Sequence, residues 1–506
     1  MQFIGEFMNK GYLLEASLIQ TLKNSGLNDE KLLKLTYSLI KLNPPKIISN
    51  SFFTENTQKL NVLLEDEDIK IFLNSFNKKE VSSCEIITEK TKKKDVEIIE
   101  ETELKPQKIF IEDFIKYFRD RYFTFKEYLQ DRALENLCSI GKLSNQQRNV
   151  SIIGMVFDKR LTKNKNLLLE IEDLTGKVTV LVRQDKQELF NKANNVVLDE
   201  VIAIRGVGSN EIIFANDVLV MDCVKEIKKH PEEIYAVFTA DLHIGSNKFF
   251  QENFLNFISW LNGEVGNEKQ KEISKKVKYL FIVGDCVDGV GVYPKQESEL
   301  LVKDIYEQYK LFAEFLRKIR KDVTIIVCPG GKHDAVYQVE PQPKLSKEFA
   351  PELYDMENVI LVPNPSLVRI AISDVFPGLD VLIYHGDSYD YYMDRIDYLR
   401  INNSKLKPDL IMQFLLKKRH LAPTHTSTTY YPCEKDLLAI RKIPDIFVSG
   451  HIHKSAVSRY NGILTISCAC WQAKTSYQEK FGHEPDPCKI PIVNLQTGKA
   501  SILDFS

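Results

Sequence analysis

Several features that would assign a protein to a class at once are missing from this sequence. No apolar run approaches the length needed to cross a bilayer, so we expect no membrane-spanning segment and no membrane partner. The first residues, MQFIGEFMNKGYLLEA, include acidic side chains and lack the basic-then-apolar order of a secretion signal, which predicts a cytoplasmic chain. The formal net charge of −2 excludes a polycation, so any contact with nucleic acid must use a local patch or a partner.

Cysteine and histidine are few, and their distribution is informative. The nine cysteines are odd in number and contain no C-x2-C pair, which favours reduced thiols over a disulfide framework. A zinc site built from Cys433, Cys468, Cys470 and Cys488 is an alternative, but ILTISCACW, which holds two of them, is typical of an apolar strand. All nine histidines lie at or after residue 230, so chemistry that uses imidazole is confined to the C-terminal half.

The chain is too long for one hydrophobic core, and we predict a multidomain protein. Residues 1–75 are predicted to form an α-helical module, because residues 13–26 and 29–45 carry apolar side chains at helical spacing. Residues 76–108 are predicted to be a charged flexible linker, because more than half of residues 78–105 are charged and none is aromatic. A helical connector over 109–148 should follow, with its amphipathic pattern in FIEDFIKYFRDRYFTFKEYL.

Residues 149–225 change to a period of two, with strand-like runs broken by turn residues. This pattern predicts an all-β, five-stranded Greek-key barrel with one helix in QELFNKANNV, and it resembles an OB-fold, which often binds single strands. The strands show little interleaving of aromatic and basic residues, so we favour a barrel that supports its neighbours over one that binds a strand. From 226 to 506, apolar strand-like runs alternate with helical ones, which predicts a layered α/β domain.

Five apolar runs in this α/β region end in side chains that can bind metal. IYAVFTA precedes Asp241 and His243, VKYLFIVG precedes Asp285 and Asp288, VTIIVCPGGK precedes His333 and Asp334, VLIY precedes His385, and PDIFVSG precedes His451 and His453. Because the ends of several strands converge at one edge of an α/β sheet, these side chains predict a metal site there. Carboxylates and imidazoles without thiolates suit Mn²⁺, Fe²⁺ or Zn²⁺, and an oxygen-rich set favours Mn²⁺. A carboxylate can bridge two cations, and Asp285 is the best candidate for that bridge.

The ordered motifs D-x-H, GD-x-x-D, H-D, H-G and GHxH resemble those of the calcineurin-like metallophosphoesterases over residues 230–470. This resemblance implies a calcineurin-like phosphoesterase domain with two divalent metal ions, expected to be Mn²⁺, with Mg²⁺, Fe²⁺ and Zn²⁺ as alternatives. It implies one cation held by Asp241, His243, Asp285 and His453, and a second held by Asp285, His385 and His451. His333 would assist the leaving group or the transition state, Asp334 would orient His333, and Asp288 would hold a ligand histidine.

The stretch CPGGKHDA departs from that family's usual G-N-H-D, in which the asparagine binds the second cation. Lys332 stands before His333, and an ammonium group has no lone pair to offer a metal. Either the longer loop supplies a backbone carbonyl, or the ammonium replaces part of the cation's charge or contacts the scissile phosphate. Each alternative predicts a weaker second site.

A narrower resemblance extends beyond the metal ligands. HDAVYQVEPQP (333–343), YHGDSYDYY (384–392), LLKKRHLAPTH (415–425) and residues 465–499 resemble the small subunits of archaeal D-family DNA polymerases, as does the domain order of nearly the whole chain. The resemblance implies a 3′→5′ proofreading exonuclease of DNA replication that hydrolyses the terminal phosphodiester at a DNA 3′ end. It also implies a heterodimer with a large catalytic polymerase subunit, and a sliding clamp as a wider partner.

Two alternatives to the exonuclease remain at this stage. The first is a non-catalytic structural subunit whose metal site is weakened, with Lys332 as the sign of decay. The second is a free-standing phosphoesterase, although the helical module, linker and barrel argue against a self-sufficient enzyme.

Two groups of residues near these motifs have both a functional and a structural interpretation. Lys417, Lys418 and Arg419 would contact DNA phosphates or a partner subunit, or would form a solvated helix face. Trp471 and Tyr477 could stack a base, but core packing is favoured because aromatic side chains bury a large area. We expect no chemistry from His420, His425 and His483.

Overall fold

The computed structural model describes residues 27–41, 95–100, 108–132, 134–336, 338–480 and 484–506, with a few isolated residues before position 71. The chain separates into two units, residues 1–90 and 91–506. In the first unit, helix α3 (Asp29–Ile40) begins after Asn28, whose side chain accepts a hydrogen bond from the Lys31 N–H, and strands β1 (Leu13–Leu14) and β2 (Ile47–Ile48) pair in parallel. The helix expected over 29–45 is therefore present as α3. The prediction of a helix over 13–26 is wrong at its start, because Leu13 and Leu14 form β1, and most of its other residues fall outside the described residues.

Part of the predicted linker is a strand. Residues 97–100 form β3 (Glu97–Glu100), which pairs with β13 (Ser366–Ser373) at the edge of a sheet. Val96 is only 2% exposed, and the preceding Asp95 accepts a hydrogen bond from the Tyr279 hydroxyl. The charged composition concealed this strand, because only Ile98 and Ile99 lie between its glutamates, and each packs against a different hydrophobic cluster on one of the two faces. Most other residues of the predicted linker lie outside the described residues.

The amphipathic helix of the predicted connector is α7 (Ile111–Gln130). It ends earlier than the predicted boundary at 148, because the described residues from 131 to 147 form turns and the short 3-10 helix η1 (Ile140–Lys142). Ile140 and Leu143 pack into the neighbouring barrel, and the Ile140 N–H donates to the Asp173 carboxylate. These contacts with the barrel override the local helical pattern.

A small closed barrel follows, with the strand order β4-β5-β6-β8-β7. Its elements are β4 (Arg148–Leu161), β5 (Leu167–Asp173), β6 (Gly176–Val182), α8 (Gln187–Asn194), β7 (Val201–Gly208) and β8 (Ile212–Leu219). The strand number and the position of the helix agree with the prediction from the period-two pattern. The interior is aliphatic, with residues such as Ile152, Leu169 and Ile204 fully buried.

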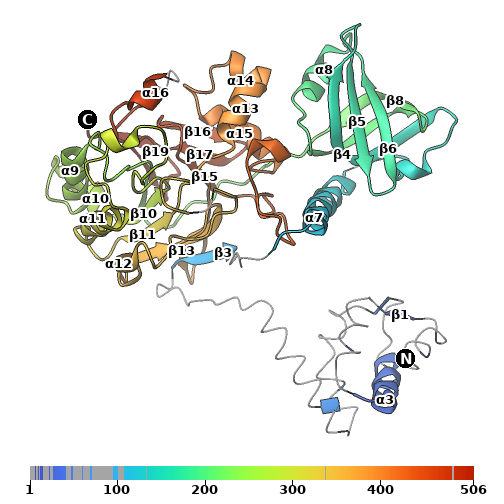
Figure 1. Ribbon diagram of the computed structural model, residues 1–506, viewed down its shortest axis with the longest axis horizontal. Coiled ribbons are helices and arrows are strands. Elements are labelled where there is room, and N and C mark those ends of the chain that lie inside the picture. The colour runs from blue at the N-terminus through green and yellow to red at the C-terminus, as the bar shows by residue number, and fades with distance from the viewer. Residues whose placement is uncertain are drawn as a thin grey trace. The chain divides into compact units, whose positions relative to one another are not determined.

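Besides the barrel, the larger unit contains two six-stranded sheets (Figure 1). The first has the order β12 (Val359–Leu361), β11 (Thr324–Cys328), β10 (Val277–Val283), β9 (Tyr235–Thr239), β18 (Lys489–Asn494) and β19 (Ala500–Asp504). The second has the order β16 (Ala456–Tyr460), β17 (Ile463–Ser467), β15 (Ile446–Ser449), β14 (Phe376–Ile383), β13 and β3. The helices of this region are α9 (Gln251–Leu261), α10 (Glu268–Lys275), η2 (Gln296–Ser298), α11 (Ile305–Arg317), α12 (Pro351–Tyr354), α13 (Tyr389–Arg395), α14 (Asp397–Ile401), α15 (Asp409–Lys418), η3 (His425–Ser427) and α16 (Ser476–Lys480).

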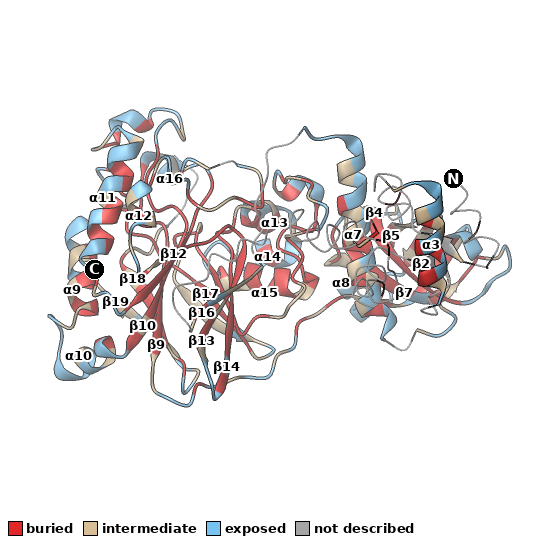
Figure 2. Ribbon diagram, turned by 90° about the horizontal axis from the view of Figure 1, so that it is seen from below, coloured by how far each residue is buried: buried red, intermediate tan, exposed pale blue. Residues whose placement is uncertain are grey.

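The two sheets pack face to face between layers of helices. Phe238 and Phe281 of the first sheet share one buried cluster with Val381 and Val448 of the second. The outer face of the first sheet packs on α9 and α11, and the outer face of the second packs on α13, α15 and α7. Figure 2 shows the resulting concentration of buried residues along the strands. Among the described helices, none combines the length and the apolar character needed to cross a membrane.

Candidate metal centre

The five ligand-bearing segments follow five strand ends, but these strands belong to two sheets. Asp241, Asp285 and His333 come after β9, β10 and β11, which are parallel neighbours in the first sheet. His385 and His451 come after β14 and β15, which are parallel neighbours in the second sheet. The expectation of a single sheet edge is therefore corrected. Because the two sheets pack face to face, the ends of both supply one site.

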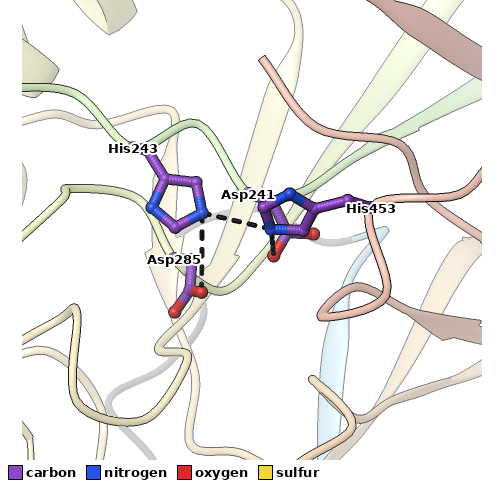
Figure 3. A group of neighbouring side chains, drawn as sticks. All are labelled: Asp241, His243, Asp285 and His453. Carbon is purple, nitrogen blue, oxygen red and sulfur yellow. Dashed lines mark hydrogen bonds and ion pairs between the residues drawn. The ribbon is translucent and has the colours of Figure 1, made fainter. Parts of the chain in front are cut away.

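The four residues predicted for the first cation form a buried group (Figure 3). His243 Nε2 lies 3.2 Å from His453 Nε2 and 3.7 Å from Asp285 Oδ2. His453 Nε2 lies 3.4 Å from Asp241 Oδ1. One ligand atom from each of the four residues lies within 4.8 Å of the others, an arrangement that could hold a metal ion.

Asp285 also faces a second group. Its Oδ1 lies 3.5 Å from His385 Nε2, whereas Oδ2 faces His243, so the two oxygens are directed at different histidines. His385, Asp387 and His451 form the neighbouring group, with ligand atoms within 4.8 Å of one another. This placement of Asp285 between two groups is what a bridging carboxylate requires.

The backbone at the site is strained. Asp241, His243, Asp285, His451 and His453 all have positive φ, at 53°, 52°, 49°, 70° and 59°. Non-glycine residues rarely adopt this left-handed conformation, which costs about 1–3 kcal/mol each and persists where the surrounding structure imposes it. Such strain is typical of functional sites, and aspartate and histidine adopt this conformation more often than most other non-glycine residues.

His333 lies beside the first group, and the backbone rather than Asp334 orients it. Its Nδ1 is 2.7 Å from the carbonyl oxygen of Asp288, and its ring centroid is 4.7 Å from that of His243. The Asp334 carboxylate instead accepts hydrogen bonds from the backbone N–H groups of Cys286, Val287 and Gly330. The expected orienting role of Asp334 is thus corrected, because its oxygens already fasten two ligand loops together.

Asp288 lies where a residue that positions a ligand histidine should be. Its Oδ1 is 3.1 Å from His243 Nδ1, which leaves His243 Nε2 directed into the first group. Gln296 and Gln472 each donate a hydrogen bond to the same carboxylate and fix it in place. This geometry suits the predicted role of Asp288, which is to position a ligand histidine.

The charges of the site are strongly coupled. Burial alone would raise the pKa of Asp285, but the imidazoles of His333, His385 and His243 outweigh burial and hold that pKa well below its usual range. Burial would lower the pKa of His385, but the negative charge of the nearby Asp285 raises it well above the usual value. Burial and the charge of Asp285 raise the pKa of Asp334 to about 7. A divalent cation would supply the positive charge that protonated imidazoles otherwise provide.

A further observation indicates that these residues suit a divalent cation. Asp285 Oδ1 is buried and has no hydrogen-bond partner among the described residues. A buried carboxylate oxygen without a partner is costly, and a metal ion would satisfy it. The donor set of carboxylates and imidazoles suits such an ion. No cysteine belongs to the groups that could hold a metal among the described residues, which leaves the alternative cysteine site without support.

Comparison with known proteins identifies the family. A family model that describes the B-subunits of DNA polymerases alpha and epsilon matches residues 236–458, a range that contains every candidate ligand. The DNA polymerase II small subunit of Methanothermobacter thermautotrophicus is 37% identical over 398 residues, which cover 78% of this chain and 80% of that protein. The chain belongs to the DNA polymerase II small subunit family.

Other members of the family are longer. The small subunit of Pyrococcus furiosus is 37% identical over 411 residues, covering 79% of this chain and 65% of that protein. That of Methanocaldococcus jannaschii is 37% identical over 392 residues, covering 76% and 64%. A solved archaeal phosphodiesterase matches 53% of this chain and 99% of its own length at 14% identity, with a TM-score of 0.25. The resemblance to archaeal D-family small subunits is therefore confirmed from sequence.

In this member of the small subunit family, two basic residues predicted to contact DNA or a partner are buried. Lys418 is 4% exposed and its Nζ lies 2.9 Å from Glu200 Oε2, so it joins α15 to the barrel. Arg419 donates to the backbone carbonyls of Ile440 and Arg441. Only Lys417 remains partly exposed. The sequence shows three consecutive basic residues, but it does not show that Lys417, Lys418 and Arg419 point in different directions.

Other predicted residues are placed as follows. Trp471 is fully buried and donates from Nε1 to Thr239 Oγ1, which confirms core packing. The side chain of Tyr477, and all of His483, lie outside the described residues. Lys332 is exposed. Sequence reasoning missed Asp387, and its one signal was its position two residues after His385.

Proposed function

We propose that this chain is the 3′→5′ proofreading exonuclease subunit of a replicative D-family DNA polymerase. The observation that carries the proposal is the buried Asp285, whose two oxygens face two separate ligand groups, in a chain of this family. A site of two divalent cations, Mn²⁺ by preference, suits in-line displacement at phosphorus.

The residues would divide the work between cation binding and proton transfer. Asp241, His243, Asp285 and His453 would hold one cation, and Asp285, His385 and His451 the other. Bound cations would supply Lewis-acid activation of water and stabilisation of charge on the phosphate. His333 Nδ1 donates to the Asp288 carbonyl, so Nε2 is the ring atom that, in the imidazolium form, would give a proton to the leaving 3′ oxygen, and the proton lost by the attacking water would restore that form. Water adds to the terminal phosphorus, the bond to the 3′ oxygen breaks, and a nucleoside monophosphate leaves.

The partners follow from the family. The polymerase II small subunits that the chain resembles are named as parts of a larger enzyme, and we propose a heterodimer with a large catalytic subunit that also acts with a sliding clamp. The closed barrel would be an OB-fold that supports the phosphoesterase region, since Lys418 and Glu200 already join the two. A DNA 3′ end would be the substrate, and a mismatched end would be favoured because it costs less to unpair.

The test is digestion of 3′-labelled single-stranded and mismatched DNA in Mn²⁺, with the full chain alone and with its large subunit. Asp285→Ala removes the bridge and should lower the rate at least about 100-fold, since loss of a single supporting partner of a metal ligand already costs 10–100-fold. Asp394→Ala is the matched control, because Asp394 is an exposed carboxylate on α13 that pairs with Lys405. It should digest at the wild-type rate.

A structural subunit with a weakened metal site is the second candidate, and the departure at Lys332 favours it. It predicts that the wild-type chain is as inert as Asp285→Ala under every condition, with and without the large subunit. A ladder of products shortened from the 3′ end in the wild type alone excludes it.

A further inference from the structure

The loop before His333 has no side chain suited to bind the proposed second cation. Lys332 is exposed and takes part in none of the hydrogen bonds or ion pairs among the described residues. The residue before it, Gly331, has no side chain and a φ of 55°. A backbone carbonyl of this loop could bind the second cation, or the Lys332 ammonium could replace part of its charge. A carboxylate from another segment is a third source of the missing ligand.

The Asp387 carboxylate occupies the place that a side chain at Gly331 would fill. A Cβ built on Gly331 would lie 3.2 Å from Asp387 Oδ1 and 3.8 Å from Oδ2. Asp387 is also within ligand distance of both histidines proposed for the second cation, His385 and His451. The Asp387 carboxylate therefore lies beside the imidazoles of His385 and His451. It lies on the side of the loop where Gly331 has no side chain to act as a ligand.

The carboxylate is held in position by a chain of buried amides. Gln342 Nε2 donates to Asp387 Oδ2 at 2.8 Å. Gln342 is itself fixed, because its Oε1 accepts from the Gly331 N–H at 3.1 Å and from Asn364 Nδ2 at 2.9 Å. Asn364 in turn accepts from the His385 N–H at 2.9 Å. One network thus sets the loop, the carboxylate and the histidine relative to one another, as supporting partners of a metal site do.

A cation at this point would also satisfy an atom that lacks a partner. Asp285 Oδ1 is buried without a hydrogen bond and faces His385 Nε2 at 3.5 Å. We infer that Asp387 is a ligand of the second cation and replaces the side chain that the 331–332 loop does not provide. This inference rests on the proposed two-metal site. The set becomes Asp285, His385, Asp387 and His451, with one more negative charge than an amide ligand would give.

The experiment counts metal rather than activity. Full-length protein is equilibrated with Mn²⁺, and bound metal is measured by equilibrium dialysis and by the electron paramagnetic resonance signal of a coupled Mn²⁺ pair. The wild type should bind two ions per chain and show the pair signal. Asp387→Ala should keep one ion, bind the second at least about 10-fold more weakly, and lose the pair signal.

Two further variants separate loss of a ligand from loss of structure. Asp394→Ala removes an exposed carboxylate from the same segment and should bind two ions as the wild type does. The double variant Asp387→Ala/Gly331→Asn places an amide oxygen on the loop instead, at a left-handed position that asparagine tolerates better than most residues. It should recover the second ion at least in part.

The outcomes distinguish this inference from the proposed function. Two ions of unchanged affinity in Asp387→Ala would overturn the inference and leave the two-metal exonuclease intact. A wild type that binds one ion would also overturn it. A wild type that binds none would remove the proposed function itself.

Discussion

At the scale of single residues, His333 has two ring nitrogens with different surroundings. Nδ1 is engaged by the Asp288 carbonyl, and the ring meets the His243 ring edge to face. Burial lowers the pKa of His333, so the imidazolium that would protonate the leaving oxygen is the minor form near pH 7. The hydrogen bond at Nδ1 directs proton transfer to Nε2, but His333 also lies within ligand distance of His243 and Asp288, so a metal role competes with it.

His333→Ala separates these roles. If His333 transfers a proton, the exonuclease rate should fall about 10²–10⁴-fold while the chain still binds two Mn²⁺ ions. Rates on 3′-labelled DNA and metal content are measured on the same preparation. His425→Ala is the control, because His425 is exposed and its Nδ1 contacts only the Tyr430 hydroxyl among the described polar side chains. If His333→Ala lost one bound Mn²⁺ ion as well as its exonuclease rate, His333 would instead be a metal ligand.

The sequence located the site residues better than it assigned their contacts. The order of motifs at strand ends was enough to predict that Asp241, Asp285 and His453 would converge, because strand ends in α/β domains do so. Asp334 was expected to orient His333, but its carboxylate accepts hydrogen bonds from three backbone N–H groups instead. Backbone hydrogen bonds of this kind cannot be inferred from the sequence. Asp387 was missed for a similar reason. Its value depends on how close its carboxylate lies to Gly331, which only the folded loop shows.

At the scale of secondary-structure elements, one buried carboxylate joins α7 to the segment after α15. Asp436 accepts from Tyr117 at 2.6 Å, from Arg121 Nε at 2.6 Å and from His420 Nε2 at 2.8 Å. Arg121 and Asp436 are fully buried. The amphipathic pattern predicted the helix α7 itself, but it could not predict a buried arginine, because hydropathy assigns arginine to the exposed face.

The same network predicts how stability changes with acid. His420 donates from Nε2 to Asp436 and accepts from the Ala422 N–H at Nδ1, so it is held in the neutral form. Burial, and then the charge of Arg121, lower the pKa of His420 from 6.5 to about 4, although Asp436 opposes this. Between pH 4 and pH 6.5, His420 is protonated in the unfolded chain but not in the folded one. Stability is therefore complete above pH 6.5 and is lost as the pH falls towards 4, by about 3 kcal/mol.

The check is urea unfolding from pH 7 to pH 4 for the wild type and His420→Gln. Glutamine can keep one donor and one acceptor in place but does not titrate, so the variant should lose less stability over this range. His425→Gln, at an exposed position, should follow the wild type. Equal losses in wild type and His420→Gln would show that His420 does not titrate in this window.

At the scale of the whole molecule, the boundary of the larger unit is set by a strand rather than by composition. The domain order inferred from changes in hydrophobic period stays a prediction, while a small closed barrel and mixed α/β sheets are present as expected. The edge strand β3 could not be predicted, because it lies in a stretch where more than half of the residues are charged. Long-range pairing with β13, far along the chain, stabilises a segment that local composition would leave unfolded.

Two truncations test this boundary. A chain of residues 91–506 keeps β3 and all candidate ligands, and should bind Mn²⁺ and unfold in urea as the full chain does. A chain of residues 108–506 lacks β3 and the buried Val96, and should lose at least about 2 kcal/mol of unfolding free energy. It should also associate more readily on size exclusion, because the edge of β13 is left unpaired. Val96→Asp in the full chain should reproduce part of the loss by placing a carboxylate in the core. If the two truncated chains prove equally stable, β3 contributes nothing to the larger unit, and the predicted linker would extend to residue 108 after all.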